Sequence, residues 1–149
     1  MNERTLAVLS SAIYVSRLAL KGEAVDTDDK RLRASGLYPD WTPGAHEAGD
    51  IYNAGGQVWE CIQNYDTGVH PDIIPGGPAW GTFHRPLHGT SPETARAFVP
   101  VTGAHDTYKA GEYAWFDGAL YQCLSETAYS PGEYPGAWAL VAEKKEDMT

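Results

Sequence analysis

The sequence has little cysteine, few basic residues and no long apolar run, and each shortage excludes a class of protein. Two cysteines in 149 residues cannot form the disulfide framework of a small secreted domain. Eleven Lys and Arg stand against 20 Asp and Glu, and the net charge of −9 argues against nucleic acid and anionic membrane surfaces as partners, because phosphate binding needs clustered cations. No apolar run approaches the roughly 18 residues of a membrane span. The N-terminus lacks a basic segment followed by a continuous apolar one, so we expect no secretory signal peptide.

Glycine, proline and aromatic residues are plentiful, with 16 Gly, 10 Pro, 5 Trp and 9 Tyr, which predicts short strands joined by many turns. Two stretches, 48–62 and 110–124, align without a gap at an offset of 62 residues (110 minus 48). Ala, Gly, Gly and Cys are identical at four positions, and five further positions hold chemically similar residues. Such self-similarity indicates one supersecondary unit that is used twice.

Each stretch predicts a β-hairpin. The dipeptides Gly55-Gly56 and Asp117-Gly118 tolerate positive φ at both central positions of a two-residue turn, and apolar residues flank them. With such a turn, Phe116 pairs with Ala119. The face that we expect to be buried consists of Tyr52, Ala54, Trp59 and Cys61 in the first copy and of Ala114, Phe116, Tyr121 and Cys123 in the second. The opposite face, which we expect to be half-exposed, consists of Ile51, Asn53, Val58 and Glu60 and of Tyr113, Trp115, Leu120 and Gln122.

A two-stranded ribbon is marginal in water, so each hairpin needs further cover. Trp80 and Trp138 follow their hairpins after a proline, and we expect each to fold back over its own sheet. Before the hairpins, apolar spacing predicts a helix over 2–21 and a shorter one over 28–34. These helices either pack on each other or on the β units, or they present an apolar stripe for docking or oligomerisation.

The predicted fold is mainly β with an N-terminal α-helical segment and two small three-stranded-type antiparallel β modules in tandem. The expected divisions are a helical segment (1–36), a first β unit (37–83), a linker (84–97), a second β unit (98–142) and a charged tail (143–149).

One spaced pattern recurs in both halves: an aromatic or His, a Gly-acid pair, a turn glycine, an aromatic two residues before Cys, then Pro and Trp. It reads His46, Gly49-Asp50, Gly56, Trp59, Cys61, Pro71 and Trp80 in the first half, and Tyr108, Gly111-Glu112, Gly118, Tyr121, Cys123, Pro131 and Trp138 in the second. The pattern resembles the chitin-binding type 3, or family 5/12, carbohydrate-binding modules. The helical segment followed by 37–41 is similar to tail proteins of tailed bacteriophages and prophages that carry such modules.

The resemblance implies a non-catalytic tail protein of the virion, made in the bacterial cytoplasm and extracellular after release, that recognises a glycan or polysaccharide on a bacterial surface. It also implies contacts with other tail proteins and a homotrimer as one assembly. A structural or adaptor role in the tail, with modules that dock proteins and bind no sugar, stays open as the alternative.

Family members attached to chitinases stack sugar on an aromatic pair after the second hairpin strand. This chain has Gln63-Asn64 and Ser125-Glu126 there, so the usual platform is missing from both copies. The remaining aromatic candidates for sugar contact are Trp115, Tyr129, Tyr65, Tyr113 and Tyr134, because they lie on the outer hairpin face or in the loops after the cysteines. We expect the other tryptophans (Trp41, Trp59, Trp80 and Trp138) to be core residues.

Catalysis and metal binding are not expected. His84 and His88 are four residues apart, but Pro86 between them breaks the helix that would place both on one face, so we expect no metal site. No nucleophile motif, phosphate-binding loop or metalloprotease motif is present, and no cofactor is expected. Cys61 and Cys123 are expected to be small buried thiols.

Overall fold

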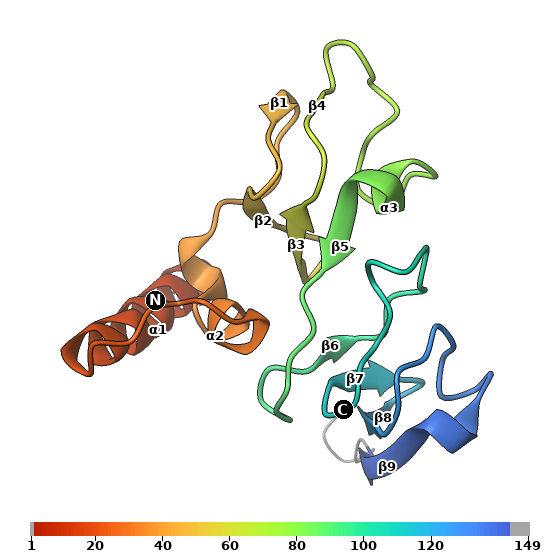
Figure 1. The fold of residues 1–149 in the computed structure, drawn as a ribbon. Helices are drawn as coiled ribbons and strands as arrows, with labels where there is room; N and C mark the ends of the chain where they lie inside the picture. The colour runs from red at the N-terminus through yellow and green to blue at the C-terminus, as the bar shows by residue number, and fades with distance from the viewer. Residues whose placement is uncertain (1, 144–149) are drawn as a thin grey trace. The chain divides into compact units, whose positions relative to one another are not determined.

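The computed structural model describes residues 2–143 and confirms a mainly β chain with an N-terminal helical segment and small antiparallel sheets (Figure 1). The chain divides into two compact units, Met1–Leu87 and His88–Thr149. The helical segment therefore belongs to the first unit, and the boundary falls inside the stretch expected to be a linker. Of the expected tail, only Glu143 lies within the described residues.

Side-chain caps define where the helices begin. Helix α1 (Glu3–Leu20) begins after Asn2, whose side-chain oxygen accepts a hydrogen bond from the Thr5 backbone N–H at 2.7 Å. Helix α2 (Asp28–Arg33) begins after Thr27, whose hydroxyl accepts from the Lys30 N–H. A 3₁₀ turn, η1 (Ser35–Leu37), follows α2 directly. Both helices expected from the sequence are thus present.

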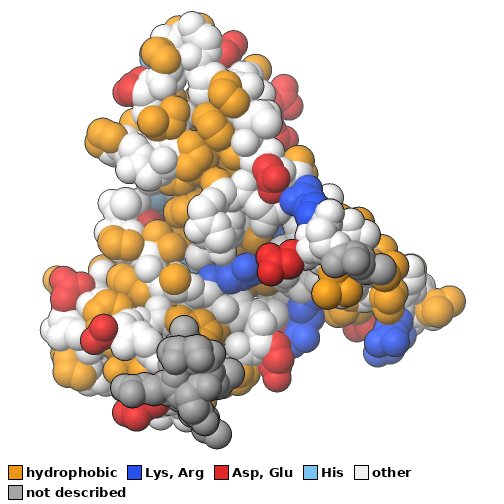
Figure 2. Space-filling view, turned by 180° about the vertical axis from the view of Figure 1, so that it is seen from behind, with side chains coloured by type: hydrophobic (Ala, Val, Ile, Leu, Met, Phe, Trp, Pro, Cys, Tyr) orange, Lys and Arg blue, Asp and Glu red, His pale blue; other side chains and the backbone are white. Residues whose placement is uncertain are grey.

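The helices pack on each other through small residues. Gly36 of η1 lies so close to the Ala7 carbonyl that a side chain there would collide with it. The Ser11 hydroxyl, buried on the same face of α1, accepts from the Gly36 N–H at 2.9 Å. Leu18 of α1 is buried, whereas Leu6, Leu9 and Ile13 of the same helix are exposed. Exposed hydrophobic side chains are also visible among the charged ones in Figure 2.

The first unit contains a three-stranded antiparallel sheet with the order β2-β3-β5. Its strands are β2 (Ile51–Ala54), β3 (Gln57–Cys61) and β5 (His84–Pro86). A two-stranded ribbon of β1 (Ala45–His46) and β4 (Tyr65–Asp66) and a short helix, α3 (Trp80–Phe83), complete the unit.

The second unit contains a four-stranded sheet with the order β6-β7-β8-β9, in which β6 runs parallel to β7 and the other pairs are antiparallel. Its strands are β6 (Arg96–Ala97), β7 (Tyr113–Phe116), β8 (Ala119–Cys123) and β9 (Trp138–Glu143), and the 3₁₀ turn η2 (Pro135–Ala137) precedes β9.

The stretch 84–97, expected to be a linker, contains β5 at its start and β6 at its end. Strand β5 contains a proline and sits among turn residues, so its local sequence does not resemble a strand. It pairs through long-range contacts: the Arg85 side chain meets Glu60 of β3, the residue directly across the ladder, at 2.6 Å. The Leu87 N–H extends the ladder to the Val58 carbonyl.

Both hairpins have the predicted register. Tyr52 pairs with Trp59, and Ala114 pairs with Tyr121 at the corresponding position of the second hairpin. The turn residues have positive φ, at 61° and 78° for Gly55-Gly56 and 50° and 80° for Asp117-Gly118, as a type I′ turn requires.

Each unit has its own core, closed by a tryptophan as expected. The buried residues are Tyr52, Cys61, Tyr65, Ile73 and Trp80 in the first unit, and Tyr108, Ala114, Cys123, Ala137 and Trp138 in the second. The outer hairpin face differs from the prediction, because Val58 and Leu120 on it are buried. Val58 packs against Leu32 of α2 and Leu87, so the helical segment covers this face of the first sheet.

The two cysteines are free and buried, and each donates its S–H to a backbone carbonyl two residues ahead, Gln63 or Ser125. Burial raises the pKa of both thiols, that of Cys123 to about 11. We therefore expect both to react slowly with an aromatic disulfide reagent in the folded protein at about pH 8, because little thiolate is present and access is blocked. In denaturant, titration should find both thiols; finding fewer would contradict this assignment.

Candidate ligand-binding surface

The candidate aromatic residues have very different exposures. Tyr129 and Tyr134 are exposed by 56% and 54%, whereas Tyr65 is exposed by only 6%. Trp115 and Tyr113 are half-buried. The structure thus brings together one exposed pair, Tyr129 and Tyr134, on the loop between β8 and β9.

The two tyrosine rings of this pair lie edge to face. Their centroids are 6.5 Å apart and the rings are nearly perpendicular, at 82°. Between them, Ser130 and Glu133 exchange hydrogen bonds: the Glu133 N–H donates to the Ser130 hydroxyl at 3.1 Å, and the Ser130 N–H donates to the Glu133 carboxylate at 3.0 Å. This is the reciprocal pattern of a capping box, used here to close a turn.

The loop is also tied to the core of the second unit. The Trp138 indole N–H donates to the Tyr129 carbonyl at 3.0 Å, and the Tyr129 N–H donates to the Thr127 hydroxyl at 3.0 Å. The Tyr134 ring lies near Gly136, where an added Cβ would meet it at 3.5 Å. The tyrosine pair is therefore presented by a loop whose backbone is fixed before any ligand arrives.

Tyr65 does not offer an exposed sugar platform, contrary to the expectation from its place after Cys61. Its hydroxyl accepts from the Trp41 indole N–H at 2.9 Å and also bonds to the Tyr52 hydroxyl and the His84 ring. Pairing of β4 with β1 turns the Tyr65 side chain into the core. Its aromatic ring is structural.

Trp115 and Tyr113 are half-buried, in keeping with the half-exposed face predicted for them, and their strand is paired on both sides. Strand β6 pairs with β7, with Ala97 beside Trp115, and the Phe98 N–H donates to the Trp115 carbonyl. The Tyr113 N–H donates to the Gly89 carbonyl at 2.9 Å. β7 is thus an inner strand of its sheet, with neighbours on both sides, which the sequence did not predict.

His84 is a core residue that sequence reasoning treated only as a possible metal ligand. Its ring stacks on Trp80 with centroids 3.5 Å apart and an interplanar angle of 17°. One ring nitrogen bonds to the Trp80 carbonyl and the other to the hydroxyls of Tyr52 and Tyr65. Burial lowers the pKa of His84 to about 4. Among the described residues, no three His, Cys, Asp or Glu side chains gather as a metal site would require.

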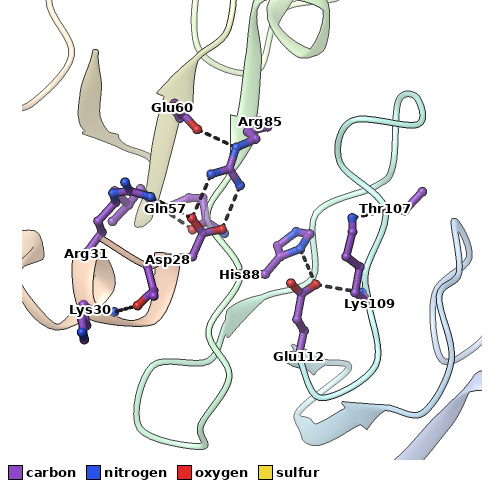
Figure 3. A network of polar contacts seen from close by, with 12 residues as sticks. Asp28, Lys30, Arg31, Gln57, Glu60, Arg85, His88, Thr107, Lys109 and Glu112 are labelled. Carbon is purple, nitrogen blue, oxygen red and sulfur yellow. Dashed lines mark hydrogen bonds and ion pairs between the residues drawn. The ribbon is translucent and has the colours of Figure 1, made fainter. Parts of the chain in front are cut away.

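Two separate polar clusters have structural roles (Figure 3). In the first unit, Arg85 makes two 2.8 Å contacts with Asp28 of α2 besides its contact with Glu60, and these acids raise the pKa of Arg85. In the second unit, the buried His88 ring lies 2.9 Å from the Glu112 carboxylate and stacks on Tyr108.

Comparison of the chain with protein-family models finds no match, and comparison with curated proteins finds none either. Within residues 2–143, no helix has the length and apolar character needed to cross a membrane.

Because His84 is neutral in the folded chain, stability should depend on pH. As the pH falls from 6.5 toward about 4, the unfolded chain gains a proton at His84 that the folded chain does not, so the free energy of unfolding falls. The difference between these pKa values corresponds to about 3 kcal/mol. Urea unfolding across this range should show the loss in the wild type and a smaller one in His84→Gln.

His70→Gln serves as the matched control, because His70 is exposed and should leave the pH dependence unchanged. A His84→Gln profile parallel to that of the wild type would show that another group titrates.

Proposed function

We propose that the protein is a non-catalytic glycan-binding protein, and that Tyr129 and Tyr134 form its sugar platform. The observation that carries the proposal is an exposed tyrosine pair on a loop fixed by its own hydrogen bonds. Flat aromatic surface suits the C–H face of a pyranose ring. A loop ordered in advance lowers the entropy cost of binding. The net charge of −9 favours an uncharged saccharide over an anionic one.

The proposed setting is the tail of a bacteriophage or prophage, where the protein recognises a glycan on the surface of the host bacterium. This setting rests on the resemblance of the spaced Gly-acid, Cys and Trp pattern to chitin-binding type 3 modules, and of the helical segment followed by 37–41 to phage tail proteins. The tyrosine pair takes the place of the missing aromatic pair, because it lies in the same loop region after Cys123.

A structural or adaptor role in the tail is the second candidate, and the surface of α1 favours it. Leu6, Leu9 and Ile13 lie at helical spacing and are exposed by 55%, 45% and 45%. Exposed apolar residues in a row are typical of helices that dock on another chain. The partner is another tail protein or further copies of this chain, a homotrimer among them.

The sugar platform is tested by replacing its rings. We expect Tyr129→Ala and Tyr134→Ala each to weaken binding to a glycan selected on an array of bacterial surface saccharides by about tenfold, with little change in melting temperature, because both side chains are exposed. Titration calorimetry and thermal unfolding measure the two effects.

Leu124→Ala is the matched control, since Leu124 is an exposed apolar residue of the same loop that lacks a ring. If both tyrosine variants bind the selected glycan as tightly as the wild type, the platform is elsewhere. If no glycan on the array binds the folded protein, the adaptor role is favoured.

The docking role of α1 is tested by light scattering. If copies of the chain associate through α1, the triple variant Leu6→Gln, Leu9→Gln, Ile13→Gln should have a monomer mass at concentrations where the wild type is larger. The exposed Leu37→Gln is the control. A wild type that is monomeric at all concentrations would contradict self-association.

A further inference from the structure

A groove of about 530 Å³ opens on the surface of the first unit. Its volume lies within the range of roughly 300–1,000 Å³ that is common for small-ligand sites. It is lined by residues from α1, the segment before β1, the β2–β3 hairpin and the loop between β4 and α3, including Arg4, Asp40, Trp41, Asn53 and Pro75.

Trp41 is the aromatic residue that lines this groove. Its indole N–H is used internally, because it donates to the Tyr65 hydroxyl at 2.9 Å. Its ring meets Trp80 edge-on at 5.9 Å and lies nearly parallel to His46 at 6.0 Å, which fixes its orientation. The side chain is half-buried, and Trp41 is one of the residues that line the groove.

The backbone that carries Trp41 is held by the first sheet. The Trp41 N–H donates to the Asn53 carbonyl, and the Asn53 N–H donates to the Pro39 carbonyl, both at 2.8 Å. The Asn53 side-chain amide donates to the carbonyls of Ser35 and Tyr38. The groove wall is thus preformed.

The rim of the groove, formed by Arg4 and Asp40, supplies both hydrogen-bond donors and hydrogen-bond acceptors. Arg4 and Asp40 form an ion pair at 3.1 Å, with side chains exposed by 54% and 69%. The pair offers N–H donors and carboxylate acceptors while adding no net charge. At the turn, a Cβ on Gly55 or Gly56 would meet no atom within 4 Å, so no side chain closes the groove there.

We propose that this groove binds a neutral saccharide, with the C–H face of a pyranose ring against Trp41 and its hydroxyl groups on Arg4 and Asp40. An aromatic wall beside paired donors and acceptors matches the two faces of a sugar ring. A strongly anionic ligand would gain little electrostatic attraction from Arg4, because the Asp40 carboxylate already neutralises its charge. The inference shares with the proposed function the premise of saccharide binding but does not require the tyrosine pair.

The test uses the full chain carrying Tyr129→Ala and Tyr134→Ala, so that the pair cannot contribute. Maltotriose, cellotriose and the trimer of N-acetylglucosamine are titrated while NMR follows the tryptophan indole N–H signals. At least one sugar should shift the Trp41 signal. Arg4→Gln and Asp40→Asn should each weaken that binding by about tenfold. The rim residues are replaced and Trp41 is not, because replacing Trp41 would also remove its packing on Trp80 and could destabilise the fold.

Arg17→Gln is the matched control, since Arg17 is exposed on α1 and does not line the groove. No shift of the Trp41 signal with any of the three sugars would overturn the inference, as would rim variants that bind like the control. If the Trp41 signal shifts with a sugar, and the tyrosine replacements do not weaken glycan binding relative to the wild type, the tyrosine platform is contradicted and the groove is not.

Discussion

Both sheets depend on one small arrangement, the exchange of two backbone hydrogen bonds between a Gly-acid pair and the cysteine at the end of the hairpin. The glycine N–H donates to the cysteine carbonyl, and the cysteine N–H donates to the carbonyl of the acidic residue. The bonds measure 2.8 Å and 2.8 Å for Gly49-Asp50 with Cys61, and 2.9 Å and 2.7 Å for Gly111-Glu112 with Cys123. Both glycines have φ between 90° and 100°, which residues with a side chain rarely adopt.

This arrangement sets where the loop after each cysteine begins, and the two loops then diverge. In the first unit, the loop returns Tyr65 to the core, where it meets His84 and Tyr52. In the second unit, a shorter loop leaves Tyr129 and Tyr134 outside. Equivalent hairpins therefore support loops with different surfaces in the two units.

What the sequence predicted well is what depends on neighbours along the chain. The turn dipeptide Asp117-Gly118 fixes the hairpin and its register locally, so no distant contact is needed. Helix α2 is predictable because Thr27 caps it from the adjacent position. Tyr129 was a candidate because of its place in the loop after Cys123, and it is exposed, whereas the same argument failed for Tyr65.

What was missed depends on contacts far apart in the sequence. Strand β5 is held by Arg85, whose partner Asp28 is 57 residues away, and nothing in its local sequence signals a strand. The burial of Tyr65 depends on His84, which is 19 residues further along the chain. The burial of Val58 on the outer face depends on Leu32 of the helical segment. No alternation pattern within a hairpin contains this information.

The late position of β5 has a consequence for how the polypeptide acquires its structure during synthesis. The first sheet cannot be completed until Pro86 has left the ribosome, because β5 pairs with β3 and Arg85 joins α2. In the second unit, β8 follows β7 at once, and β9 then completes the sheet across a loop (124–137) that is shorter than the stretch between β3 and β5 (62–83). Short-range pairing closes quickly, so the nascent N-terminal unit spends the longer time with an open sheet edge and is the part for which a chaperone would matter most.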